Sequence, residues 1–151
     1  MKKLGSTILA GAVVSLVVVA LAPAAAREGL YKVSAALTSR ADVPAPKGAA
    51  GARGTFTGTY KENSTGAVLN WKLTFSGLTG KAAAAHIHTG KPGVAGPVIV
   101  PLCGPCHSGQ TGTVKVTKAT IAALEGGRGY VNVHTAKNAG GEIRGQIKVT
   151  G

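Results

Sequence analysis

The feature that most constrains the fold is a two-residue alternation of apolar and polar side chains. It is clearest in the segment 68–75, where from residue 69 onward one parity reads Leu, Trp, Leu, Phe and the other reads Asn, Lys, Thr. Successive side chains of a β-strand point to opposite faces, so this pattern places all the apolar residues on one face. We therefore expect a half-buried strand here, whose apolar face covers a core.

Short segments of similar character follow one another along the chain, separated by turns rich in Gly, Asn or Pro. We expect further strands at 30–37, 54–60, 83–88, 98–100, 112–117, 130–134 and 143–149. A short helix is expected at 118–124, with Thr117 as its N-cap and glycines after its end. Residues 40–54 are rich in Pro, Gly and Ala and are expected to form a loop. About eight short strands predict a single all-β domain, an antiparallel Greek-key β-sandwich or barrel.

The alternation also predicts the core. The apolar residues on the inward parity of each segment are Val33, Leu37, Leu69, Trp71, Leu73, Phe75, Ile87, Val98, Val100, Val114, Val116, Leu124, Val131, Val133, Ile143 and Ile147. By the same rule, the polar residues between them face outward.

The first 26 residues have the layout of a secretory signal peptide. Lys2 and Lys3 are followed by an apolar run from Ile8 to Leu21 and by small residues that end at Ala26. The apolar run is shorter than the roughly 20 residues that a spanning helix needs. We therefore expect cleavage after Ala26, a mature domain of residues 27–151, no transmembrane segment after cleavage, and a periplasmic or secreted protein.

The chain is strongly basic. Seventeen Lys and Arg against five Asp and Glu give a formal charge of +12, of which two positive charges belong to the predicted signal peptide. This excess suits acidic partners, such as anionic components of the cell envelope or an exported protein. The predicted export argues against nucleic acid as the partner. The basic residues are dispersed among the strand segments, as on a solvated sheet face.

Three of the four histidines lie in two strand-like segments. His86 and His88 are two residues apart and so share one face of their strand, and His134 lies in the segment 130–134. Imidazole suits copper and zinc, and three imidazoles leave a coordination position open. The sequence therefore suggests a metal site, with copper favoured. In the alternative, these histidines bond backbone carbonyls or Glu142 and have a structural role.

The two cysteines form a Cys103-x-x-Cys106-His107 segment. In an exported protein, two cysteines usually pair, which predicts a disulfide that closes a short loop. The same letters occur in redox-active dithiols and in the attachment pattern of c-type haem, so both remain alternatives. His107 is also a possible additional ligand of the histidine site.

Two charged residues, Glu142 and Arg144, have the spacing of a same-face ion pair on a strand, and we expect a structural role for them. No Ser-His-Asp set, paired carboxylates or phosphate-binding loop is evident. The sequence therefore leaves open whether the protein is an enzyme, and favours a binding protein.

Four segments together closely resemble the CHRD domain, a family named after chordin, an extracellular antagonist of growth factors. They are AHIH at 85–88, GVAGPVIVPL at 93–102, GYVNVHT at 129–135 and GGEIRGQI at 140–147. The resemblance extends over roughly residues 30–149. It implies an extracellular all-β domain of the kind found in exported bacterial proteins.

A weaker, local resemblance concerns the histidines. His86, His88 and His134 are similar in pattern to the copper site of Cu/Zn superoxide dismutases, which are also β-sandwiches. The bridging histidine and the zinc ligands of that enzyme have no match in this sequence. The sequence thus predicts an exported CHRD-domain binding protein for copper. The alternatives are a dismutase-like copper enzyme, a c-type haem electron carrier and a structural or adhesive envelope module.

Overall fold

The computed structural model describes residues 29–151, so the predicted signal peptide at 1–26 lies outside the described residues. The described chain is almost entirely β-structure with one short α-helix. Its elements are β1 (Leu30–Thr38), η1 (Ser39–Ala41), β2 (Arg53–Glu62), β3 (Gly66–Ser76), β4 (Ala82–Thr89), β5 (Val98–Cys103), β6 (Gln110–Thr117), α1 (Lys118–Glu125), β7 (Gly129–Thr135), β8 (Ile143–Gln146) and β9 (Lys148–Thr150).

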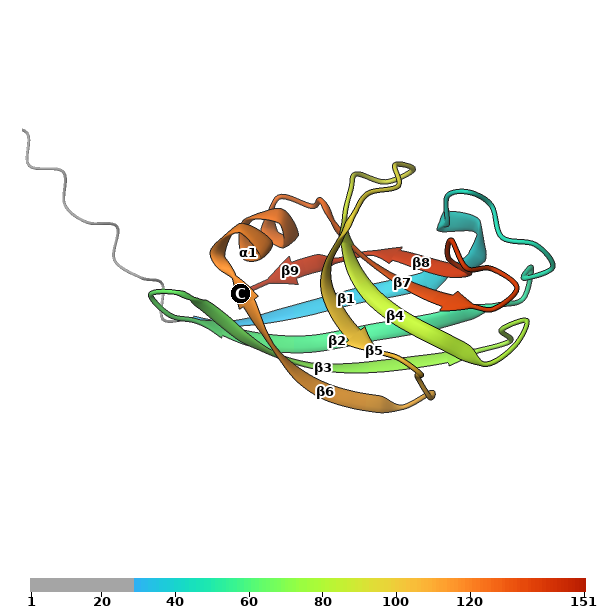
Figure 1. Cartoon of the computed structure of the whole chain (residues 1–151). Helices are drawn as coiled ribbons and strands as arrows, with labels where there is room; N and C mark the ends of the chain where they lie inside the picture. The colour runs from blue at the N-terminus through green and yellow to red at the C-terminus, as the bar shows by residue number, and fades with distance from the viewer. Residues whose placement is uncertain (1–28) are drawn as a thin grey trace, which may run out of the picture.

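The strands pair in the order β5-β4-β7-β8-β1-β2-β3-β6, and β9 pairs with β1. All pairs are antiparallel, but β8 and β1 are joined only at Thr38 and Arg144. The molecule therefore consists of two layers, β5-β4-β7-β8 and β9-β1-β2-β3-β6, which share one core (Figure 1). The neighbours β4–β7 and β3–β6 are not consecutive in sequence, as in a Greek-key arrangement. The predicted antiparallel β-sandwich is confirmed.

Strand β3 shows why these residues form this fold. Leu69, Trp71 and Leu73 are buried, and the polar residues between them are exposed. Phe56 and Tyr60 on the neighbouring strand β2 complete this part of the core, although the apolar alternation did not select them. Most of the predicted core is buried, but Val98 is 48% exposed, because it begins β5 beside the loop that joins β4 to β5. The prediction for Val98 is therefore wrong.

The expected last strand, 143–149, is interrupted at Ile147. Before this residue the chain pairs with β7 as β8, and after it the chain pairs with β1 as β9. Ile147 is buried, and its N–H donates to the carbonyl oxygen of Gly129 at 2.9 Å. One continuous segment thus passes from one layer to the other, and this connects the two sheets.

The short helix α1 starts as the sequence predicts. The Thr117 side chain accepts a hydrogen bond from the Thr120 N–H at 3.1 Å, and Ile121 and Leu124 are buried against the core. After the last turn, the Gly126 N–H donates to the carbonyl oxygen of Ala122. Between residues 29 and 151, no helix is both long and apolar enough to span a membrane.

Candidate metal centre

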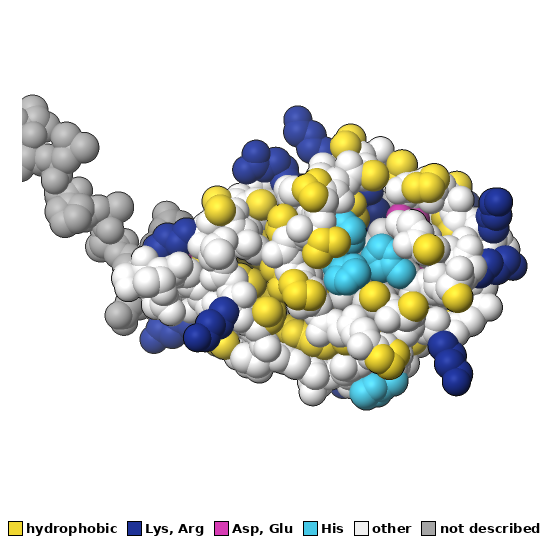
Figure 2. Space-filling model, in the orientation of Figure 1, with side chains coloured by type: hydrophobic (Ala, Val, Ile, Leu, Met, Phe, Trp, Pro, Cys, Tyr) yellow, Lys and Arg dark blue, Asp and Glu magenta, His cyan; other side chains and the backbone are white. Residues whose placement is uncertain are grey.

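The three strand histidines lie together on the outer face of the β5-β4-β7-β8 layer. His86 and His88 come from β4 and His134 comes from β7, and these two strands are hydrogen-bonded neighbours. Ile87 and Val133 point the other way and are fully buried in the core. The three imidazole centroids are 5.0, 5.6 and 5.7 Å apart. Figure 2 shows a compact group of histidine side chains with apolar side chains around it.

The ligand atoms of this group are close enough for one metal ion. One nitrogen from each histidine lies within 4.8 Å of the other two, and His86 Nδ1 is 3.2 Å from His134 Nε2. Two nitrogens bound to one tetrahedral metal at 2.0–2.1 Å would be about 3.3 Å apart. The His86–His134 pair already has this separation, and the histidine triad (His86, His88, His134) could hold a metal once the wider separations, up to 4.8 Å, close.

Backbone carbonyls determine the orientation of two of the rings. His88 Nδ1 donates to the carbonyl oxygen of Gly96 at 2.9 Å, and His134 Nδ1 donates to that of Ala139 at 3.0 Å. A nitrogen that faces a carbonyl oxygen must carry the proton, which leaves the Nε2 lone pair for a metal. His88 Nε2 is buried and has no hydrogen-bond partner. A buried polar atom without a partner is costly, and a bound cation would satisfy it.

The electrostatics of the site favour neutral imidazoles. Burial lowers the pKa of His86, and nearby His134 and His88 lower it further. Burial also lowers the pKa of His134, and this effect and that of His88 outweigh the opposing effect of the Ala139 carbonyl. Since a metal binds the deprotonated ring, lower pKa values keep these ligands available near neutral pH.

The loop between β4 and β5 covers part of the triad. The Tyr130 hydroxyl accepts from the Gly96 N–H at 3.0 Å and lies 3.3 Å from the Gly96 carbonyl oxygen, to which it donates. A side chain at Gly96 would overlap the carbonyl oxygen of Thr89, so this position requires glycine. The Tyr130 ring stacks on His88 with a centroid distance of 5.0 Å. The histidines face outward as predicted, but His88 is only 8% exposed because of this cover.

A buried polar cluster that sequence reasoning missed lies beside the triad. Asn132 Nδ2 donates to Asp42 Oδ1 at 3.2 Å, and neither Asp42 Oδ2 nor Asn132 Oδ1 has a hydrogen-bond partner. Burial raises the pKa of Asp42, against the opposing effects of Val43, Asn132, and Arg144. The sequence did contain one indication that Asn132 lies near the triad, because Asn132 and His134 are two residues apart and share one face of their strand. Asp42 lies in a predicted loop and carried no such signal.

The predicted ion pair of Glu142 and Arg144 is not formed, and both side chains are buried rather than exposed. The Glu142 carboxylate accepts hydrogen bonds from Thr79, Thr135 and Asn138. The Arg144 guanidinium donates to the Lys91 carbonyl oxygen at 2.8 Å and lies over the Tyr130 ring, 3.5 Å from its centroid. Loops and strand β7 supply these partners, which the spacing of two residues between Glu142 and Arg144 does not reveal.

The cysteine segment forms the turn between β5 and β6. Cys103 and Cys106 are joined by a disulfide, so neither sulfur is a free thiol that could bind haem or metal. His107 is exposed, its N–H donates to Gln110 Oε1, and it does not belong to the group of converging ligands. The structure therefore does not bring His107 to the triad as an additional ligand.

The family model of the CHRD domain matches residues 33–147. This range begins in β1, ends at Ile147 between β8 and β9, and includes the whole histidine triad. No curated protein and no solved structure matches the chain. Since the match extends over most of the sequence and over most of the sandwich, the chain belongs to the CHRD domain family.

Proposed function

We propose that this protein is an exported CHRD-domain binding protein whose histidine triad holds a copper ion. The observation that carries the proposal is the buried, unpartnered Nε2 of His88, whose ring is oriented by Gly96. Each of the three histidines offers one nitrogen to a group whose members lie within 4.8 Å of one another, and His86 Nδ1 is 3.2 Å from His134 Nε2.

The donor set supports copper. Three imidazole nitrogens suit copper and zinc, whereas magnesium, calcium and manganese prefer carboxylate and carbonyl oxygens. Among divalent first-row metals, nitrogen sites bind Cu²⁺ most tightly. His86 and His134 remain partly exposed, so a fourth position is accessible from solvent. Such a site can load, release or exchange its metal.

Export is supported by two independent features. The first 26 residues combine a basic start, an apolar run and small residues at the expected cleavage point. The Cys103–Cys106 disulfide suits an oxidising compartment such as the periplasm or the medium. These two features agree with the extracellular setting that the family name implies.

The test is metal binding by the full chain, expressed with its own N-terminus and purified from the periplasm or the medium. After removal of metal with EDTA, Cu²⁺ and Zn²⁺ are titrated against a chelator of known affinity. We expect one Cu²⁺ per chain and nitrogen hyperfine splitting in the electron paramagnetic resonance spectrum. His88→Ala should weaken copper binding by more than about 100-fold, beyond the loss typical of an outer-shell partner.

The matched control is His107→Ala, which removes an exposed imidazole outside the triad. It should bind copper like the wild type, and thermal melts of the metal-free proteins should show that both variants are folded. Equal copper affinity of His88→Ala and the wild type would contradict the proposal.

The same preparation distinguishes the alternatives. Superoxide consumption that depends on copper and is lost in His88→Ala would indicate a dismutase-like enzyme. A Soret band would indicate haem on Cys103 and Cys106 and would contradict their disulfide. A folded chain that binds neither copper nor zinc would be a structural or adhesive module.

A further inference from the structure

A second surface lies on the opposite side of the sandwich from the histidine triad. It is the outer face of the layer β9-β1-β2-β3-β6, and we call it the threonine–lysine face. The register aligns its side chains in rows across the strands. One row consists of Lys32, Thr59, Asn70 and Thr113.

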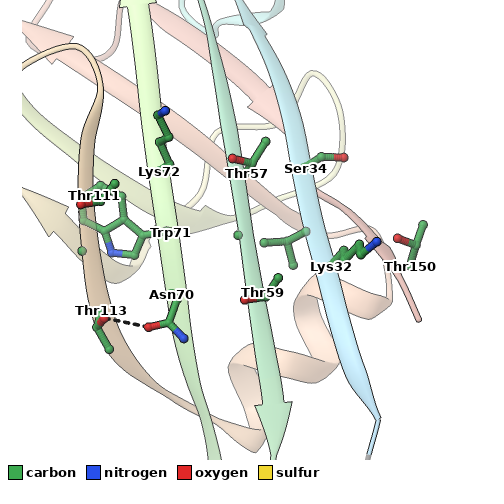
Figure 3. A pocket seen from close by; sticks show the side chains of 13 residues that line it. Lys32, Ser34, Thr57, Thr59, Asn70, Trp71, Lys72, Thr111, Thr113 and Thr150 are labelled. Atoms are coloured by element: carbon green, nitrogen blue, oxygen red, sulfur yellow. Dashed lines mark hydrogen bonds between the residues drawn. The ribbon is translucent and has the colours of Figure 1, made fainter.

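The adjacent row has the same chemistry and consists of Ser34, Thr57, Lys72 and Thr111. Between the two rows lies a shallow depression of about 760 Å³, with Gly58 and Gly112 among the residues that line it. Figure 3 shows the hydroxyl, amide and ammonium groups of both rows on the strands that line this depression. The depression thus has a lining of hydrogen-bonding groups with two ammonium groups among them.

The charge of this face is of one sign. Its outward cations are Lys32, Arg53, Lys61, Lys72, Lys115 and Lys148. The four acids of residues 29–151 lie elsewhere. Asp42 and Glu142 are buried, Glu125 bonds the Tyr60 hydroxyl, and Glu62 has the inward parity of Tyr60. The positive potential of the face is therefore not neutralised by any Asp or Glu side chain upon it, and it attracts anions.

We propose that the threonine–lysine face binds an acidic polysaccharide. Threonine, serine and asparagine side chains donate and accept hydrogen bonds, as sugar hydroxyls do. Threonine is stiff at its first side-chain torsion, so little conformational freedom is lost when its hydroxyl is bound. Thr113 Oγ1 donates to Asn70 Oδ1 at 2.8 Å, which orients the exposed Asn70 side chain within its row.

The spacing of the cations on this face favours an acidic polysaccharide over a nucleic acid as the ligand. From strand spacing and rise, the Cα atoms of Lys32 and Lys148 are about 8 Å apart and those of Lys32 and Lys72 about 12 Å apart. Duplex DNA carries one charge per roughly 1.7 Å of its axis, a much denser array. The aromatic side chain that lines the depression, Trp71, is only 5% exposed, so it offers bases little surface for stacking. The face fits an extended polymer with well-separated carboxylates and many hydroxyls.

The experiment measures binding of the EDTA-treated full chain to immobilised polygalacturonate at physiological salt, with dextran as the neutral comparison. The face variant carries Lys32→Gln, Lys72→Gln and Lys148→Gln. The control carries Lys81→Gln, Lys91→Gln and Lys137→Gln, three exposed lysines away from this face. Both variants lose the same net charge, so only the position of the charge differs.

We expect the wild type to bind polygalacturonate and not dextran. The face variant should bind roughly 100-fold more weakly, the loss expected when three lysines leave an anionic surface. The control should stay within a few-fold of the wild type. Thr59→Val, which keeps the shape but removes a hydroxyl, should also weaken binding.

Three results would overturn the proposal. An equal loss in the face variant and the control would mean that net charge alone attracts the polymer. Tighter binding to a single-stranded oligonucleotide or to vesicles of anionic phospholipid than to polygalacturonate would assign the face to another partner. Absence of binding by the folded wild type would remove the site altogether.

Discussion

Replacement of Glu142 by glutamine tests how the buried polar groups hold the loops beside the triad. The carboxylate is fully buried, and each of its oxygens accepts hydrogen bonds. Oε1 accepts from the Thr79 N–H at 2.5 Å, and Oε2 accepts from Thr79 Oγ1, Thr135 Oγ1 and Asn138 Nδ2 at 2.6, 2.5 and 2.9 Å. These bonds join the β3–β4 loop to the end of β7 and to the β7–β8 loop.

The loss of stability in Glu142→Gln can be estimated from the groups that donate hydrogen bonds to the carboxylate. If the glutamine NH₂ replaces Oε1, it faces the Thr79 N–H, which cannot become an acceptor. If it replaces Oε2, it faces the Asn138 NH₂ group. In the first orientation the Thr79 N–H loses its acceptor. In the second, Asn138 Nδ2 loses its shortest bond but keeps the Lys47 carbonyl oxygen and Thr79 Oγ1 as acceptors, at 3.2 and 3.3 Å. The lost bond costs about 1–3 kcal/mol, and the remaining bonds lose their charge assistance. We expect Glu142→Gln to reduce the free energy of unfolding by about 3–5 kcal/mol, out of roughly 5–15 kcal/mol for a domain of this size.

The pH dependence has a defined sign. Burial alone would raise the pKa of Glu142, but hydrogen bonds from Asn138, Thr135 and Thr79 outweigh it and hold the pKa below its usual range. The carboxylate therefore stabilises the fold above the unfolded pKa of about 4.3. This stabilisation is lost as the pH falls through the lower, folded pKa. Glutamine does not titrate, so the difference between wild type and variant should shrink in acid.

The assay is urea denaturation of the full chain in EDTA at several pH values from 7 to 3. Glu62→Gln is the control, since Glu62 is less buried and lies at the end of β2, and it should change stability by no more than about 0.5 kcal/mol. The reasoning is refuted if Glu142→Gln is as stable as the wild type at pH 7. It is also refuted if the difference stays constant down to pH 3.

Three further predictions concern the core, the site and the cysteines. Trp71→Ala should destabilise the protein by roughly 3–5 kcal/mol in urea denaturation, because a 5% exposed indole leaves a cavity, and a smaller effect would mean that the core refills. Gly96→Ala should weaken copper binding by about 10–100-fold in the chelator titration, because it displaces the carbonyl that orients His88, and unchanged affinity would contradict this role. Non-reducing mass spectrometry should show the Cys103–Cys106 bond as a loss of two hydrogens without a haem mass, whereas a haem adduct would contradict it.

Local pattern was sufficient for much of this fold. The two-residue period of β3 identified its buried face, and Thr117 marked the start of α1 with a hydrogen bond that the structure contains. The same period placed His86 and His88 on one face of β4. Such features depend only on residues a few positions apart, so a single sequence reveals them.

The partners of these elements were decided only by the tertiary structure. Nothing in the segments around His86 and His134 states that β4 and β7 are neighbours, and the triad exists only because they are. The break at Ile147 arises because one segment pairs with two distant strands, and the cover over His88 comes from a loop held by Tyr130. Glu142 likewise takes partners from two loops instead of the arginine two residues away. Strand pairing and the loop over His88 depend on contacts between residues far apart in sequence. The energies of these contacts are determined by tertiary packing, so a local alternation of side chains does not reveal them.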